Sequence, residues 1–396
     1  MRPGLGLVLS GGGARGAYEA GVLGYIFGEL APKHATRSSL RVIAGTSVGA
    51  VNGAFVASVA HDLGPGVAQL EALWRELELD HVMRFGVRQL AGLPRVLFGG
   101  VEAPGLFDAT PLVKLVGEGV DWRRLRQNLR EGILGALAAT ATNVPTGRPT
   151  IFIDRAPGVP LPERFTQPRV AIKAVRMGPA HVLASAAIPI VFPPIRVGRQ
   201  LHCDGGLRLN TPIAPALHLG AERLLVIGVS DPEQGVLQVL PDDRYPGATF
   251  LLGKVLNAFL IDHLNSDLAE LRRVNQRLED GIEAFGPRYL DAMQEKSLER
   301  GESPRGIVPV VSVRPSEDLG GIASRVLARQ RKRFGRALGK PLLRLVDAGE
   351  GQDADLASYL LFDGAYARAL MDLGRRDAAQ QRDEIASLLF DHTSSG

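Results

Sequence analysis

Three short segments, far apart in the chain, carry the residues that could do chemistry. They are Ser10-Gly-Gly-Gly-Ala-Arg-Gly16, Gly45-Thr-Ser-Val-Gly49 and Asp204-Gly-Gly206. A serine hydroxyl, a carboxylate that can take its proton, and backbone amides free of side chains are the groups that cleave esters through an acyl-enzyme. We therefore ask whether the chain folds so that these three segments meet.

Ser47 lies in a G-x-S-x-G pattern between a predicted strand, 41–46, and a predicted helix, 47–61. In that context the pattern indicates a nucleophile elbow, in which the serine occupies a tight strand-to-helix turn. Gly45 and Gly49 remove side chains that would clash there. The hydroxyl would point out of the sheet near a helix N-terminus, whose dipole favours negative charge. The alternative is a glycine-rich turn with an incidental serine.

The segment 11–16 also matches G-x-G-x-x-G, the fingerprint of dinucleotide-binding folds. That function requires an acidic residue near the end of the next strand, and none lies between residues 32 and 51. A P-loop is excluded because no Gly-Lys-Ser/Thr follows. We interpret the amides of Gly11, Gly12 and Gly13 as hydrogen-bond donors to an oxyanion.

Asp204 is the candidate base for Ser47. It follows a predicted strand, 199–203, on a sharp turn with Gly205 and Gly206. A carboxyl with a pKa of about 3.9 is a weak base in water. A desolvated site beside Leu207 and the prolines at 193 and 194 would raise that pKa. The alternative is a turn-forming Asp-Gly-Gly without chemistry.

Two neighbouring side chains each have two open interpretations. Arg15 either anchors the glycine loop or binds a substrate phosphate. His202 lies on the same strand face as Asp204 and is either a third member of the site or a buried or rim histidine. None of the eight histidines lies in a context that marks it as a base.

The predicted elements bring the glycine loop and Ser47 to one sheet edge. The first 61 residues indicate strand (5–10), loop, helix (17–30), strand (41–46), turn and helix (47–61), which is typical of a doubly wound parallel sheet. We expect an α/β fold with a mostly parallel central sheet and helices on both faces. The catalytic domain is predicted at 1–230. A mainly helical region follows at 231–396, with 307–313 as a candidate strand that returns to the main sheet.

Together, the three segments resemble the patatin-like phospholipase family. Ala184-Ser-Ala-Ala-Ile-Pro-Ile-Val-Phe-Pro-Pro194 and Asn210-Thr-Pro212 support the resemblance, which covers about the first 230 residues. The stretch from Tyr359 to Ala378 is less specifically similar to the tails of bacterial members. The resemblance implies that Ser47 is the nucleophile and Asp204 the base of a Ser–Asp dyad. It also implies an oxyanion hole at Gly12 and Gly13, with Arg15 and Gly16 completing the loop motif, and no metal or organic cofactor.

Composition narrows the class of protein further. An apolar fraction of 45% and a charged fraction of 22% in 396 residues exclude wholesale disorder. The net charge of +4 is too small to indicate a nucleic-acid partner. Cys203 is the single cysteine, which excludes an intrachain disulfide and a multi-cysteine metal site.

No membrane span or signal peptide is expected. The uncharged stretches 42–60 and 177–195 contain several glycines and prolines, respectively, and fit buried core better than a spanning helix. The N-terminal apolar run of about six residues is shorter than an export segment requires. We therefore expect a protein that is cytoplasmic or peripheral to a membrane.

The leading hypothesis is a serine acyl hydrolase acting on lipids, of phospholipase A or lysophospholipase type. A small-ester or thioester hydrolase and a non-catalytic lipid-binding protein are the alternatives. Two stretches are candidates for peripheral membrane contact. Leu90–Phe107 is apolar and is either an interfacial flap or a core-packed excursion; Arg325–Lys340 is basic and either contacts anionic headgroups or is a solvated helix face.

Overall fold

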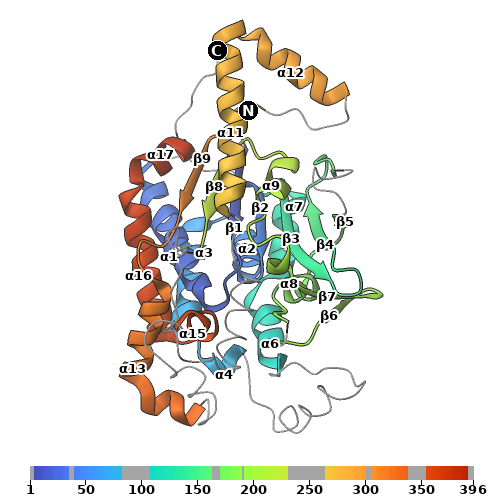
Figure 1. The fold of residues 1–396 in the computed structure, drawn as a ribbon. Helices are drawn as coiled ribbons and strands as arrows, with labels where there is room; N and C mark the ends of the chain where they lie inside the picture. The colour runs from blue at the N-terminus through green and yellow to red at the C-terminus, as the bar shows by residue number, and fades with distance from the viewer. Residues whose placement is uncertain are drawn as a thin grey trace, which may run out of the picture.

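The structure is a computed structural model that describes residues 4–34, 40–82, 108–162, 170–189, 191–230, 264–299, 306–337 and 354–390. Its centre is a mostly parallel sheet with the order β5-β4-β3-β2-β1-β8-β9 (Figure 1). The strands on this path are β1 (Leu5–Leu9), β2 (Leu40–Thr46), β3 (Ala136–Asn143), β4 (Pro149–Arg155), β5 (Ala171–Ala174), β8 (Arg223–Ile227) and β9 (Val310–Val313). The short strands β6 (Ile195–Val197) and β7 (Gln200–Asp204) form a hairpin, and β7 pairs antiparallel with β3.

Helices cover both faces of this sheet, as predicted (Figure 1). In the first half they are α1 (Gly16–Leu23), α2 (Val48–Ser58), α3 (Leu63–Arg75), α4 (Leu79–Val82), α6 (Thr110–Gly119), α7 (Trp122–Arg130), α8 (Pro179–Ser185) and α9 (Ile213–His218). In the second half they are α11 (Leu264–Phe285), α12 (Arg288–Glu299), α13 (Leu319–Ala337), α15 (Ala354–Leu360), α16 (Gly364–Gln380) and α17 (Arg382–Phe390). A π-helical turn, Gly24–Leu30, continues α1.

Successive side chains of the central strands belong in turn to two different apolar clusters. This explains why these strands appear in the sequence as continuous apolar runs. Leu5, Leu7 and Leu9 face the cluster that contains α1, α2, α3 and α16, whereas Val8 faces the cluster that contains α9 and the start of α11. A strand covered on both faces needs apolar residues at every position, unlike a strand with one solvated face.

The C-terminal region packs directly onto the first half of the chain. Strand β9, inside the segment 307–313, pairs in parallel with β8. Helix α16 packs against α1 at two glycines: a Cβ on Gly21 would lie 2.2 Å from the Met371 carbonyl oxygen, and one on Gly374 would lie 2.5 Å from the Tyr18 carbonyl oxygen. The division of the chain near residue 230 stays a prediction.

Several elements were not predicted from the sequence. Strands β5 and β6 are short and partly exposed, so they lack the apolar runs by which the central strands were found. Helices α6, α7 and α12 were also not predicted. Within the described residues, no helix is both long and apolar enough to cross a membrane.

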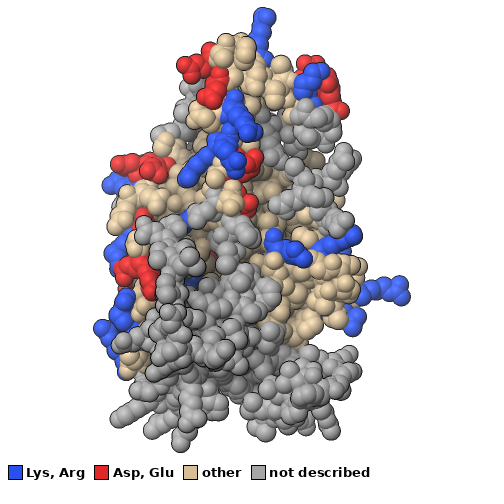
Figure 2. Space-filling view, in the orientation of Figure 1, with Lys and Arg blue, Asp and Glu red and all other residues tan. Residues whose placement is uncertain are grey.

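Of the two stretches proposed for membrane contact, Leu90–Phe107 lies outside the described residues. The basic stretch Arg325–Lys340 is described in part, as the end of α13. There the exposed Arg325 pairs with Glu317 at 3.6 Å. The space-filling view shows basic and acidic side chains intermixed at the top, where α11 and α12 lie (Figure 2).

Candidate active site

Ser47 occupies a strained turn between β2 and α2. Its backbone has φ 54° and ψ −124°, and it is the one non-glycine residue with positive φ in the described part of the chain. A Cβ on Gly45 would lie 2.2 Å from the Gly49 carbonyl oxygen, and one on Gly49 would lie 2.4 Å from the Leu9 carbonyl oxygen. Both neighbouring positions therefore require glycine. Strain of this kind is held by the surrounding structure and clusters at functional sites.

Contacts on both sides hold the Ser47 backbone in this conformation. Its N–H donates to the Ser185 hydroxyl, at the end of α8, with an N–O distance of 2.9 Å. Its carbonyl accepts from the N–H groups of Ala50 and Val51 in the first turn of α2. The residue is only 2% exposed.

Asp204 ends β7 and is buried next to Ser47. The structure brings the two together because β7 pairs with β3, with Ala141 opposite Asp204, and β3 in turn pairs with β2, the strand that ends directly before Ser47. A Cβ on Gly205 would lie 2.4 Å from the Thr140 carbonyl oxygen, so the turn after Asp204 packs against β3.

The electrostatic state of Asp204 is set mainly by burial. Burial raises the pKa of this carboxyl to about 6, and hydrogen bonds from the Ser47 hydroxyl and the Gly206 N–H oppose the rise. The Gly206 bond, to Oδ1, is 2.7 Å long. Oδ2 is also buried, and no group among the described residues lies in hydrogen-bonding geometry to it. A carboxylate of raised pKa, in contact with a hydroxyl, can accept a proton.

The glycine loop lies against the same serine. A Cβ on Gly11 would lie 3.1 Å from the Ser47 Cβ. The Gly11 N–H donates to the Asn210 carbonyl at 3.1 Å, so the prediction that this amide serves an oxyanion is not supported. Among the described residues, the amides of Gly12 and Gly13 have no hydrogen-bond acceptor. Gly13 has φ 56°, which favours glycine.

Arg15 is an anchor of the loop. The side chain is 1% exposed, and its Nε donates to the Ser358 hydroxyl at 2.7 Å. Its Nη1 donates to the Tyr359 hydroxyl at 3.1 Å. Of the two interpretations from the sequence, anchoring fits these contacts, because a buried and partnered guanidinium is not presented to a substrate phosphate. Gly16 follows, and a Cβ there would lie 2.3 Å from Val48.

His202 is a buried core residue. It is fully buried, lies edge-on to the Phe152 ring at 5.2 Å between centroids, and its ring nitrogens have no hydrogen-bond partner in the described residues. It therefore makes no hydrogen bond to Asp204. Burial, with Lys173 nearby, lowers its pKa. No group of three or more His, Cys, Asp or Glu side chains that could hold a metal ion occurs in the part of the chain that is described.

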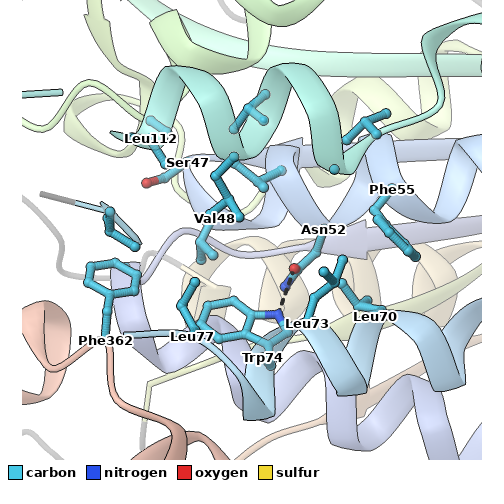
Figure 3. A pocket seen from close by; sticks show the side chains of 18 of the residues that line it. Ser47, Val48, Asn52, Phe55, Leu70, Leu73, Trp74, Leu77, Leu112 and Phe362 are labelled. Atoms are coloured by element: carbon cyan, nitrogen blue, oxygen red, sulfur yellow. Dashed lines mark hydrogen bonds between the residues drawn. The ribbon is translucent and has the colours of Figure 1, made fainter. Parts of the chain in front are cut away.

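An apolar pocket opens beside Ser47 (Figure 3). It measures about 790 Å³ with its opening to solvent included. Its lining residues are Gly13, Ser47, Val48, Val51, Asn52, Phe55, Leu70, Leu73, Trp74, Leu77, Val82, Leu112, Leu115, Val116, Gly119, Val120, Ala186, Ile188, Phe192 and Phe362.

Asn52 adds little polarity to this pocket, because its amide is already bonded. Its Oδ1 accepts from Trp74 Nε1 at 3.1 Å, and its Nδ2 donates to the Gly16 carbonyl at 3.0 Å and to Glu19 at 2.8 Å. Apart from Asn52 and the Trp74 indole, which bond to each other, Ser47 is the polar side chain of this lining.

A family model described as patatin-like phospholipase matches residues 7–217, more than half of the chain. The chain belongs to the patatin-like phospholipase family. The matched region contains Ser47, Asp204 and the glycine loop, and membership indicates a hydrolase of lipid acyl esters.

Solved structures similar to this patatin-like chain include VipD from Legionella pneumophila, at 13% identity and a TM-score of 0.36, covering 96% of this chain and 67% of that one. The type III effector protein ExoU is similar at 13% identity and a TM-score of 0.27, covering 100% of this chain and 90% of that one. A search of curated proteins finds no match.

Sequence reasoning missed several residues that shape this site. Ser185 and Asn210 lie inside segments that carried the family resemblance, so a signal for them existed, although no role could be assigned. Tyr359 and Phe362 lie in the less specific stretch 359–378, and Ser358 lies just before it. No role for them followed from the sequence, because the contact of Arg15 with Ser358 spans 343 residues.

Proposed function

We propose that this protein is a serine acyl hydrolase of lipids, of phospholipase A or lysophospholipase type, that uses a Ser47–Asp204 dyad. The observation that carries the proposal is the contact between the Ser47 hydroxyl and the buried Asp204 carboxylate at the wall of an apolar pocket. A hydroxyl beside a base, next to a site for an apolar substrate, is the arrangement that acyl transfer requires.

The reaction follows from these positions. Ser47 Oγ attacks the ester carbonyl carbon while Asp204 accepts the hydroxyl proton. The N–H groups of Gly12 and Gly13 stabilise the negative charge on the tetrahedral oxygen. The C–O bond of the ester breaks, and Asp204 returns the proton to the departing alcohol or lysolipid. Water, deprotonated by Asp204, then attacks the acyl carbon. The bond from Ser47 Oγ to the acyl carbon breaks, Asp204 returns the proton to Ser47 Oγ, and the fatty acid is released.

The pocket supports an acyl chain as the group that is transferred. It follows helix α2 from Ser47 to Phe55, and eight residues at 1.5 Å per residue give about 12 Å. Aliphatic and aromatic side chains line this path (Figure 3). An extended hydrocarbon gains free energy there through removal of its surface from water. Peripheral contact with the lipid surface belongs to the same proposal.

The decisive experiment is labelling with a fluorophosphonate, followed by mapping of the modified residue, alongside phospholipid hydrolysis. We expect the label at Ser47, and loss of both label and turnover in Ser47→Ala. Asp204→Asn should slow both by at least about a hundredfold, because the general base is lost. Ser58→Ala is the matched control, since Ser58 is a buried serine of α2 bonded to the Phe55 carbonyl.

The outcomes separate the alternatives. Undiminished ester hydrolysis in Ser47→Ala would end the proposal. Lipid binding without labelling would favour a non-catalytic lipid-binding protein. A chain-length series of esters and thioesters distinguishes a lipid hydrolase, whose kcat/KM rises with chain length, from a small-ester or thioester hydrolase.

A further inference from the structure

The glycine loop is held from outside the family-matched region. Residues 357–362, here called the C-terminal contact segment, lie against the loop although they are more than 340 residues away in sequence. Ser358 accepts a hydrogen bond from Arg15 Nε, and the Tyr359 hydroxyl accepts one from Arg15 Nη1. The Arg15 guanidinium also lies over the Tyr359 ring, 3.9 Å from its centroid.

The backbone of the same segment touches the loop directly. A Cβ on Gly13 would lie 2.3 Å from the Tyr359 carbonyl oxygen. On its other sides the loop meets Val229, 2.3 Å from a Cβ placed on Gly12, and the Asn210 carbonyl that accepts from Gly11. The C-terminal contact segment is thus one of three supports that fix where the Gly12 and Gly13 amides point.

The segment also reaches the pocket. Phe362 lines it, and its ring stacks near that of Trp74, with 6.4 Å between centroids and 14° between planes (Figure 3). Ser358 and Tyr359 are almost fully buried. One short segment therefore contacts both the loop and the pocket wall.

We infer that Arg15 is a positioning residue and that it sets the oxyanion-binding amides through the C-terminal contact segment. The guanidinium is buried and directed at Ser358 and Tyr359, so it acts through the loop and makes no contact with substrate. This inference rests on the proposed function. Because the amides act on charge that develops in the transition state, their displacement lowers kcat and leaves KM nearly unchanged.

The test uses the full chain with Ser358→Ala, Tyr359→Phe and the double variant. Tyr359→Phe removes one hydroxyl and keeps the ring beneath the guanidinium. The matched control is Tyr18→Phe, which removes a buried tyrosine hydroxyl that donates to Asp377 of α16 at 2.9 Å rather than to the C-terminal contact segment. Fluorophosphonate titration gives the concentration of reactive Ser47, so that kcat on a soluble ester is expressed per active site.

We expect the double variant to lose about tenfold or more in kcat per active site, with KM changed less than twofold. The reason is that an amide moved out of position loses much of its stabilisation of the oxyanion in the transition state. Affinity for a trifluoromethyl ketone, whose serine adduct carries an oxyanion, should fall in parallel. Tyr18→Phe should keep the wild-type kcat and the wild-type ketone affinity, even if its melting temperature falls as far as that of the double variant.

Wild-type kcat and ketone affinity in the double variant would overturn the inference, as would an equal loss in Tyr18→Phe. If the double variant does not fold, Tyr359→Phe alone decides by the same two measurements. Failure of the proposed function is recognised separately, because the wild-type chain would then neither label at Ser47 nor hydrolyse the ester.

Discussion

At the scale of single residues, the most consequential feature is that Asp204 is buried and that no positively charged side chain in the described part of the chain donates a hydrogen bond to it. Its hydrogen bonds come from neutral donors, Ser47 and the Gly206 amide, so burial dominates and the pKa is about 6. A carboxylate in water would be a poor base for a serine hydroxyl. Desolvation moves its pKa closer to neutrality, where a proton acceptor is both ionised and effective.

This pKa predicts the acid limb of the pH–rate profile. Since only the ionised carboxylate accepts a proton, kcat/KM for a neutral short-chain ester should be constant above about pH 7 and fall about tenfold per pH unit well below pH 6. The measurement is an initial-rate series from pH 4.5 to 8.5. A limb near pH 4, typical of an exposed carboxyl, would contradict the assigned environment of Asp204.

The same shift predicts a change in stability of defined sign. The folded-state pKa is raised, so the protonated form is favoured by folding. This contribution is fully present below the unfolded-state pKa, near 4, and is lost as pH rises through about 6. Asp204→Asn should therefore unfold with a free energy higher by about 3 kcal/mol at pH 7 and little changed at pH 4. Urea unfolding at both values measures this, and equal effects at both would contradict it.

At the scale of elements, much of the site could be predicted because its signals are local. G-x-S-x-G between an apolar strand and a helix is enough to place Ser47, and the structure has β2 ending at Thr46 and α2 starting at Val48. The parallel strands β1 and β2 were predicted from two apolar runs with a helical pattern between them. Their parallel pairing puts the glycine loop and the serine at one edge.

Other parts depend on contacts that leave no periodic pattern. The antiparallel insertion of β7 beside β3 brings Asp204 to Ser47. Residue type and the family resemblance made Asp204 the candidate base, but the predicted elements did not show how its strand joins the sheet. The hydrogen bond from the Gly11 amide to the Asn210 carbonyl could not be predicted, because the loop that carries Asn210 lies 199 residues further along the sequence. The choice between two interpretations of Arg15 likewise depended on Ser358 and Tyr359.

The packing of α2 and α3 around the pocket predicts control of chain length. Leu73 lines the pocket and is 37% exposed, so a larger side chain there is tolerated by the fold and narrows the pocket. Leu73→Trp should lower kcat/KM for long-chain esters about tenfold or more and leave an acetyl ester unchanged. Val113→Trp is the matched control, because Val113 is 43% exposed on α6 and does not line the pocket. Equal losses for both chain lengths would argue against an acyl site.

At the scale of the whole molecule, the C-terminal helices complete the core that begins at the N-terminus. Every residue of α1 is buried, and α16 covers it with Tyr366, Leu370 and Leu373 among its buried residues. The Tyr18 hydroxyl donates to Asp377, which in turn accepts from the Ser316 backbone and hydroxyl. Arg375 of α16 pairs with Glu71 of α3 and with Glu29.

This packing predicts that α1, β1 and α16 unfold together. Exposing α16 would also expose the apolar side chains of α1 and leave the Tyr18–Asp377 hydrogen bond broken, so no stable intermediate is expected. In hydrogen exchange with increasing urea, amides of 16–23, 5–9 and 364–380 should converge on one free energy of opening. Loss of protection in α16 while β1 stays protected would instead indicate two independent units divided near residue 230. In that case the contact of Arg15 with the C-terminal segment would open without unfolding the sheet.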